Sequence, residues 1–536
     1  CLAKRPADRP QSAAELVTML DSVASTSGER SPYSPARRLA PRAIWIALPL
    51  VLGISMVLWV VFGDDQPNAI EAPKSVAVLP FVNVGGGQSD EYFSDGITDE
   101  LTSALARIEG LRVASRSSAF SFKAKRDLDS RAIGRALNVE TVVEGTFRRS
   151  GDRLKVGAQL TSTSDGVILW SDTYERRVAD VFDVQEDIAK SIAAALQLEL
   201  GSARSLVTGT RNPEAHDLYL RGRFAWNRRS ATDFANAVRY FEEAIAKDPS
   251  FARAYSGLAE THVIRANFDA RLPSSEYWKK AKTAALRALQ LDSSLVEAQA
   301  ALAYGYGMYE RDPEAAERAF RRAIQMNPNY GTAHQWYGDF LASRGHLERS
   351  LAELRIARSL DPLSLQINAE VGRGLFLLRR PSEAVDDLQR SVTIDPTFSG
   401  SRMYLGMALI ASGDHVRGLE EQQSAVTLSG RRPIALGRLA VGLAVAGRPR
   451  EAEAVLAELK GRMQSGERVW FPMALCYIAL GRSEEAIDAL ERAVASLDGA
   501  LAEQTFDPTL DPVRSHPRFV ALWASMGLPP ASPDWR

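Results

Sequence analysis

The sequence has almost no cysteine. Among 536 residues there are two, Cys1 and Cys476, and they stand on opposite sides of the long apolar run 43–62. We therefore expect no intrachain disulfide, and the folded parts must be held together by their hydrophobic cores.

A strong charge of either sign is also missing. The formal net charge is −1, from 65 Lys and Arg against 66 Asp and Glu. Nucleic-acid binding usually needs a concentrated basic surface, so we expect no nucleic-acid partner.

The usual motifs of metal, nucleophile and nucleotide sites are absent as well. The six histidines are scattered, without H-E-x-x-H or a nearby cysteine, so no metal site and no catalytic triad are expected. The glycine run 85–87 separates a predicted strand from a predicted helix, where backbone N–H groups can bind phosphate. Neither G-x-G-x-x-G nor G-K-[ST] is present, and an ordinary loop is the better interpretation. We expect no cofactor in this chain.

The run 43–62 has twenty residues without one charge, in a chain that is 24% charged. Twenty helical residues reach about 30 Å, the thickness of the hydrocarbon core of a bilayer. A buried core helix would carry a polar stripe, and a signal peptide would not follow a charged leader of forty-two residues. The run therefore predicts a single transmembrane helix, with the lipid bilayer as a partner.

The charges that flank this run predict its orientation. Basic residues precede it, and mainly acidic residues follow it. Because cytoplasmic loops are enriched in Lys and Arg, residues 1–42 are predicted to be cytoplasmic and 64–536 extracytoplasmic, in a periplasm. The expected location is the inner or plasma membrane, with one crossing.

The first residues have a helix-start pattern that needs a partner domain. Ser12 and Glu15 form a capping box, and apolar residues follow on one helical face. About twenty residues cannot form a core alone, so we expect the chain to be a carboxy-terminal fragment of a longer protein. Residues 25–42 are rich in Ser, Pro and Arg, which predicts a juxtamembrane linker.

The string CLAKRPADRP, with SAAEL from Ser12, resembles the last two helices of bacterial serine/threonine protein kinases, whose usual form is LxKDPxxRPxSAxEL. The resemblance covers 1–24, and Arg5 stands where Asp is commoner. It implies that Arg9 forms a buried ion pair with the glutamate closing the activation segment, and it implies ATP and Mg for the missing kinase domain. The Gly-rich loop, V-A-I-K lysine, H-R-D loop and D-F-G sequence are all missing, so the chain as given is not expected to be an enzyme.

In 74–200, short apolar strands alternate with amphipathic helices, which predicts a small α/β domain. We expect strands at 75–81, 111–115, 141–148, 153–161 and 167–174, and helices at 92–108, 130–137 and 181–200. The strands on either side of Ser150-Gly151-Asp152 should pair as a hairpin. Asp95, Asp99 and Glu100 on the first helix are expected to lie in solvent.

This segment resembles the TolB-like amino-terminal domain that follows the membrane helix in bacterial signalling proteins. The resemblance is carried by SVAVLPF (75–81), EYFSDGITDELTSAL (91–105), VVEGTFRRSGDRLKVGAQL (142–160), LWSDTYER (169–176) and DVFDVQEDIA (180–189). It implies a non-catalytic sensing or docking module.

Residues 213–500 repeat with a period of 34. Pro328, Pro362 and Pro396 are 34 residues apart, and small residues recur in another column at Gly338, Gly372, Gly406, Ala440 and Ala474. Large residues recur at Phe320, Leu354, Leu388, Gln422, Leu456 and Leu490. Small residues are expected where two helices cross closely, and the large ones where the next repeat packs.

A repeat of this length and pattern resembles the tetratricopeptide repeat. About eight copies would span 213–500, and 501–536 would cap the last one. The resemblance implies an all-α superhelix with a concave groove lined by the first helix of each pair. By column position, the residues expected to face a protein or peptide in this groove are Gln335, Asp339, Gln366, Arg373, Phe376, Met403 and Met407.

The predicted fold class is multidomain, with a single transmembrane helix, a small α/β TolB-like domain and a tetratricopeptide-repeat superhelix. The predicted function is the sensor and protein-interaction region of a bacterial receptor serine/threonine kinase, in which ligand binding alters how two chains associate as a homodimer. The alternatives are the equivalent tail of an adenylate cyclase or winged-helix regulator, or a non-enzymatic membrane scaffold.

Overall fold

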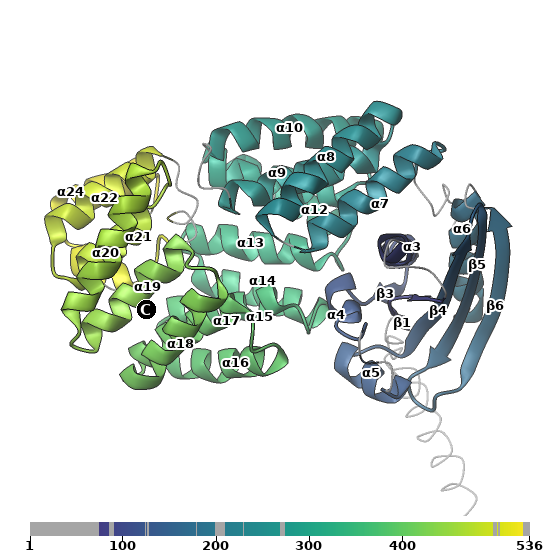
Figure 1. Cartoon of the computed structure of the whole chain (residues 1–536), viewed down its shortest axis with the longest axis horizontal. Helices are drawn as coiled ribbons and strands as arrows, with labels where there is room; N and C mark the ends of the chain where they lie inside the picture. The colour runs from purple at the N-terminus through teal and green to yellow at the C-terminus, as the bar shows by residue number, and fades with distance from the viewer. Residues whose placement is uncertain are drawn as a thin grey trace, which may run out of the picture. The chain divides into compact units, whose positions relative to one another are not determined.

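The computed structural model describes residues 74–84, 90–123, 125, 128–177, 180–198, 209–228, 230–268, 274–496, 501 and 504–528. Contacts divide the chain into two units, Cys1–Ala72 and Pro73–Arg536, and the described residues all belong to the second unit (Figure 1). The kinase-like residues 1–24 with Arg9, the linker 25–42, the apolar run 43–62 and the glycine run 85–87 lie outside the described residues.

The predicted fold class, which included a single transmembrane helix, is corrected. In the part of the chain that the structure describes, no helix is both long and apolar enough to cross a bilayer. The longest of these helices, α10 (Ser274–Leu291), has 18 residues, including Glu276, Lys279 and Lys280. Each buried charge would oppose insertion by about 2.5–3.5 kcal/mol. The single-pass membrane location and the bilayer partner, which depended on the predicted helix, are withdrawn with it.

The α/β domain is built on one six-stranded sheet in the order β3-β1-β4-β5-β6, with β2 also paired to β4. The strands are β1 (Lys74–Val78), β2 (Val82–Asn83), β3 (Leu111–Val113), β4 (Thr141–Ser150), β5 (Arg153–Ser162) and β6 (Ile168–Arg177). β1 runs parallel to both β3 and β4, whereas β4, β5 and β6 are antiparallel. The predicted hairpin is β4–β5, where Ser150 faces Arg153 and Gly151 has φ +60°.

Helices cover both faces of this sheet because the residues of its central strand β1 alternate between two cores. Val76 and Val78 belong to the larger core, with α3 (Glu91–Leu105) and α6 (Val181–Ala195). Ala77 and Leu79 belong to a smaller core, with α4 (Arg116–Phe120) and α5 (Ser130–Leu137). The sheet is therefore the middle layer of three (Figure 1).

The rest of the described chain consists mainly of helix pairs. The first helices of the pairs are α7 (Pro213–Arg228), α9 (Ala252–Phe268), α11 (Val296–Gly305), α13 (Gly331–Ser343), α15 (Leu365–Leu377), α17 (Ser399–Ala411), α19 (Pro433–Val445) and α21 (Trp470–Ala479). The second helices are α8 (Ala231–Lys247), α10, α12 (Pro313–Met326), α14 (Leu347–Leu360), α16 (Pro381–Ile394), α18 (His415–Leu428), α20 (Pro449–Gln464) and α22 (Ser483–Ala495). These are eight pairs, as the period predicted. A π-helical turn, η4 (Tyr306–Glu310), extends α11, and η5 (Pro508–Val513) and α24 (Pro517–Ser525) follow the pairs.

The two columns of small and large residues explain how each pair packs. A Cβ atom added to Gly338 would lie 2.9 Å from Leu354, one added to Gly372 would lie 2.3 Å from Leu388, and one added to Gly406 would lie 2.6 Å from Gln422. Each large residue thus lies against the glycine of its own pair. A larger residue at these glycines would force the two helices apart.

Candidate functional site

The α/β domain is joined to the first helix pair by an apolar core. The larger core of the sheet continues into α7 and α8, where Leu220, Phe234 and Phe241 are buried. The closest approach of the backbones is at Gly96 of α3, where an added Cβ would lie 2.7 Å from Leu220. The domain and the repeats therefore share one core at this joint.

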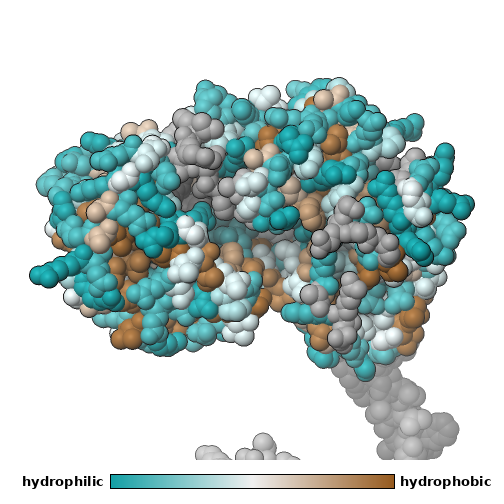
Figure 2. All heavy atoms as spheres, in the orientation of Figure 1, coloured by the Kyte–Doolittle hydropathy of each residue, from teal (hydrophilic) through white to brown (hydrophobic). Residues whose placement is uncertain are grey.

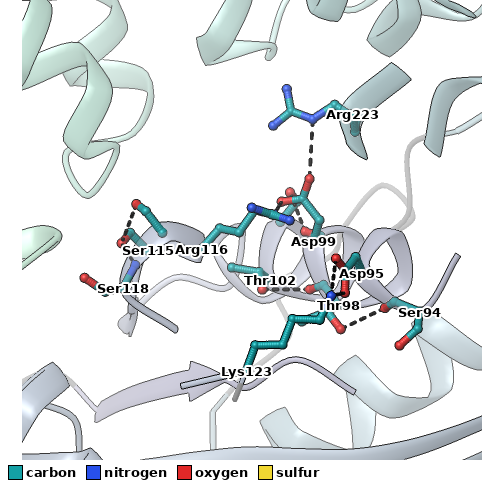
Figure 3. Close-up of polar contacts among 12 residues, drawn as sticks. Ser94, Asp95, Thr98, Asp99, Thr102, Ser115, Arg116, Ser118, Lys123 and Arg223 are labelled. Atoms are coloured by element: carbon teal, nitrogen blue, oxygen red, sulfur yellow. Dashed lines mark hydrogen bonds and ion pairs between the residues drawn. The ribbon is translucent and has the colours of Figure 1, made fainter. Parts of the chain in front are cut away.

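The acids of α3 complete the joint. Asp99 lies 3.6 Å from Arg116 of α4 and 3.4 Å from Arg223 of α7 (Figure 3). The buried carboxylate of Glu100 lies 2.8 Å from His216 Nε2 and accepts a hydrogen bond of 2.7 Å from Gln185. The expectation that these acids lie in solvent is therefore wrong, because cations brought in by the fold cover them.

The electrostatics of this helix follow from burial and its partners. Burial alone would raise the pKa of Glu100, but His216, Arg253 and the hydrogen bond from Gln185 outweigh it and lower the pKa. For Asp95, burial prevails and raises the pKa, although Lys123 lies 2.7 Å away and opposes the shift. Glu100 is thus held as a carboxylate inside the joint.

A second contact joins the α/β domain to the middle of the repeats. Ser118 of α4 donates a hydrogen bond of 2.5 Å to Asp361, which lies between α14 and α15, and accepts one of 2.8 Å from the backbone N–H of Leu363. Ser117 also donates to Asp361. The α/β domain therefore touches the repeats at two separated places, and together they form a closed ring.

A cavity of about 3070 Å³ lies inside this ring. Its wall consists of α3, β3 and α4 on one side, and of the first helices α7 to α19 with the turns that precede them on the other. A recess opens near the middle of the face drawn in Figure 2, with apolar side chains gathered below it. Small-molecule pockets usually measure about 300–1,000 Å³, so this cavity is large enough for part of another protein.

Four of the seven residues predicted to face a groove line this cavity: Gln335, Asp339, Gln366 and Met403. The other three do not. Arg373, Phe376 and Met407 are 1%, 5% and 5% exposed, and Phe376 and Met407 belong to the core of the repeats. Their placement in the groove is corrected, because these three side chains pack into the interior of the repeats, although Asp339 at the same repeat position as Arg373 and Met407 does line the cavity.

The sequence analysis missed a column of wall residues at the same spacing of 34. Trp336, Glu370 and Tyr404 line the cavity; Trp336 and Tyr404 directly follow the predicted Gln335 and Met403, and Glu370 lies between the predicted Gln366 and Arg373. Trp336 packs against Tyr304 with ring centroids 5.2 Å apart, and Tyr304 lines the cavity too. The period of 34 alone does not distinguish this column from the neighbouring one, so either could have been predicted to line the groove.

The next residue in this column, Arg438 of α19, is covered by the chain's own carboxy-terminal segment. The guanidinium is 1% exposed, lies 2.5 Å from Asp507, and donates hydrogen bonds of 3.1 Å to both Gln504 and Thr509. The same segment reaches back to α13, where Phe506 packs on Gly345. Residues 504–528 therefore close the far end of the array as well as covering its last pair.

Two observations concern metal and thiol groups. Within the described ranges, no group of three His, Cys, Asp or Glu side chains could hold a metal ion. Cys476 is buried, and burial raises the pKa of its thiol to about 12, which suppresses the reactive thiolate.

Comparison with known proteins identifies the repeats. Family models described as tetratricopeptide repeat match residues 223–270 and 308–364, and residues 467–496. The predicted tetratricopeptide repeats are confirmed, and with them a fold whose general role is protein–protein interaction.

Similar proteins include a bacterial and a vertebrate one. The chain is 35% identical over 198 residues to "Putative adenylate cyclase 3" of Rhizobium meliloti (strain 1021), a match that covers 36% of this chain and 34% of the relative. It is 25% identical over 259 residues to "Tetratricopeptide repeat protein 37" of Xenopus laevis, covering 46% and 16%. The chain thus spans well under two thirds of the length of both relatives.

Among solved structures, pilF of Pseudomonas aeruginosa is similar at 20% identity. The match covers 41% of this chain and 94% of that protein, with a TM-score of 0.33.

Proposed function

We propose that this chain is a protein-binding regulatory region, which holds an extended segment of a partner protein in the cavity between the α/β domain and the repeats. The cavity carries the proposal, because it is about 3070 Å³ in volume and both domains contribute to its wall. Tetratricopeptide repeats in the wall support a protein or peptide as the occupant.

The enzyme that this region regulates is proposed to be a serine/threonine protein kinase. Support comes from the kinase-like string at 1–24, in which Arg9 has the place of a structural arginine, and from the TolB-like pattern at 74–200. A bound partner acts only through different affinities for two arrangements of the protein. In this proposal it shifts the association of two chains, and so the contact between their kinase domains.

An adenylate cyclase is the second candidate for the regulated enzyme. It is favoured by the 35% identity over 198 residues to a protein named as a putative adenylate cyclase. The binding role of the cavity is the same in both cases, and the product of the enzyme differs.

The binding role is tested with random 15-residue peptides displayed on phage and selected on the full chain. Gln335→Trp with Gln366→Trp places two bulky rings in the cavity, so we expect at least about 10-fold weaker binding of the selected peptides, measured by fluorescence anisotropy. Gln389→Trp, on the exposed side of α16 and outside the cavity, is the matched control and should leave binding unchanged. Equal binding by all three proteins would contradict the proposal.

The choice of enzyme is tested in the longer protein that each candidate requires. Deletion of 213–500 should change autophosphorylation in response to a cavity-binding peptide if the enzyme is a kinase. It should change cyclic AMP formation if the enzyme is a cyclase. Unchanged regulation in both assays would remove the regulatory role and leave binding alone.

A further inference from the structure

The two sides of the cavity carry opposite charges. Among the described residues of its wall, the α/β domain contributes two acids and four bases, whereas the repeats contribute seven acids and three bases. Two of the three bases are engaged at the joint, where Arg223 lies 2.9 Å from Glu260, itself one of the seven acids, and Arg253 lies 3.7 Å from Glu100. Without the Arg223–Glu260 pair, six acids and two bases remain on the repeat side. The wall formed by the repeats is therefore acidic, although the chain as a whole has a net charge of −1.

In the middle of this wall, two carboxylates line the cavity and a guanidinium lies beneath them in the interior of the repeats. Asp339 and Glu370 line the cavity, and both are bonded to Arg373, which lies 2.7 Å from Asp339. Arg373 is 1% exposed and does not reach the cavity. Two carboxylates share one guanidinium, so the group has a formal net charge of −1, and Asp339 and Glu370 reach the cavity wall with only 7% and 5% of their surface exposed.

Aromatic rings lie beside these carboxylates. Tyr304, Trp336 and Tyr404 line the cavity from α11, α13 and α17, and Asp339 and Glu370 stand on α13 and α15. Aromatic faces attract Lys and Arg side chains, and the aliphatic stems of these side chains pack well on them. Carboxylates then bind the charged ends.

We propose that the wall formed by the repeats selects an extended polypeptide segment rich in Lys and Arg. This inference rests on the proposed function and names the class of its partner. Charge complementarity with the repeats carries it, since an acidic partner would bring like charges against that wall. The bases of the α/β side would repel the same segment, so we place it against the repeats and not against the α/β side. The hydrogen bonds of Ser118 with Asp361 close the ring around the cavity, which favours a segment over a folded domain.

The test uses two fluorescein-labelled 15-residue peptides that alternate Leu and Ser with either Lys or Glu. We expect the Lys peptide to bind the full chain at least about 10-fold more tightly than the Glu peptide, and its affinity to fall as salt is raised from 50 to 500 mM. The phage selection should also enrich Lys and Arg.

Variants locate the effect on the wall. The triple variant Asp339→Asn, Glu370→Gln and Arg373→Met removes the charged group without leaving a lone buried ion. It should bind the Lys peptide about 5-fold more weakly than the wild type does. Glu314→Gln, in an exposed part of α12 outside the cavity, should have no effect. If the triple variant unfolds by circular dichroism, Glu297→Gln on the wall replaces it.

The possible results separate the inference from the proposed function. Equal binding of both peptides, tighter binding of the Glu peptide, or an equal effect of Glu314→Gln would overturn the charge preference. If selected peptides still bind and are blocked by the two tryptophans, the proposed function survives that failure. If no peptide of any composition binds, both fail.

Discussion

The two ends of the repeat array are closed by different elements, and each closure buries a charged group. At the first pair, Glu100 of the α/β domain meets His216, Gln185 and Arg253. At the seventh pair, Arg438 meets Asp507 of the carboxy-terminal segment. Both closures use polar contacts between residues far apart in the chain.

They differ in how the buried charge is shared. Glu100 has several partners and lies beside a large apolar core that continues from the sheet into α8. Arg438 has one charged partner, Asp507, beside the neutral Gln504 and Thr509. Its Nε atom, like the Oε1 atom of Glu100, is buried without a hydrogen-bond partner. Loss of one partner from a buried pair leaves an uncompensated charge, so the far closure depends on one residue while the first closure does not.

The largest effect is expected from Asp507→Ala at the far closure. It leaves the guanidinium of Arg438 buried without its carboxylate, which costs about 3–5 kcal/mol. Because a repeat array need not unfold in one step, the measurement is native-state hydrogen exchange of α19 to α22. The double variant Arg438→Met with Asp507→Leu removes both charges and should lose much less stability than Asp507→Ala. Unchanged exchange in Asp507→Ala would remove the contrast between the two ends.

A smaller effect is expected from Glu100→Gln at the first closure. The amide keeps an acceptor for Gln185 but loses the charge that holds His216 and Arg253, at a cost of about 2 kcal/mol. Hydrogen exchange in α3 and α7 measures it. Asp183→Asn, at an exposed position of α6, is the control and should have no effect. A loss as large as that of Asp507→Ala would show that the first closure is equally dependent on one residue.

The same carboxylate makes the first closure sensitive to acid. Its pKa is lowered in the folded protein, against about 4.3 for an unfolded glutamate. The stabilisation is therefore complete above the unfolded value and is lost as the pH falls through the lower, folded value. Protection factors of the amides in α3 and α7, which correct for the intrinsic pH dependence of exchange, should fall below about pH 4.3 in the wild type, and this fall should be smaller in Glu100→Gln.

Ser118→Ala tests the contact that closes the ring, with an expected loss of about 1 kcal/mol. The change removes the donor to Asp361 and the acceptor for the Leu363 N–H. Exchange of the Leu363 amide should therefore accelerate about 5-fold. Ser121→Ala removes only a hydrogen bond to the Ser118 carbonyl within the same domain and should leave that amide unchanged.

The smallest effect is expected from Arg379→Gly. Arg379 has φ +59°, and the corresponding positions of later pairs are Gly413, Gly447 and Gly481, which also have positive φ. Glycine would relieve about 1 kcal/mol of strain, while the half-exposed pair with Asp511 contributes about 0.2–1 kcal/mol. The two effects should cancel to within about 0.5 kcal/mol in urea unfolding. Asp511→Asn loses the ion pair with Arg379 and also the one with Arg514, without relieving strain, and should be destabilised.

The sequence predicted the features that depend on neighbours along the chain. The hairpin at Gly151 follows from alternation along the chain and is observed. The recurring columns of small and large residues follow from a fixed period, but Leu388 lies against Gly372 of its own pair and not, as predicted, only where the next repeat packs. The burial of Glu100 was not predicted, because its partner His216 lies in another domain, 116 positions away.

The cavity wall was only partly predictable for a related reason. A repeat column identifies the helix face to within about one turn, so Gln335 and Met403 reach the wall while Arg373 and Phe376 lie in the interior. The contribution of α4 depends on how the domain docks, which leaves no periodic pattern in the sequence.

The closed ring also has a kinetic consequence. A chain segment longer than the cavity must either thread through the ring end first or wait until the Ser118–Asp361 contact opens. Association that requires such an opening is slower than diffusion allows, and dissociation is slowed by the same barrier. A partner could then remain bound for a long time at modest affinity, so the region would stay occupied after the free partner has been removed.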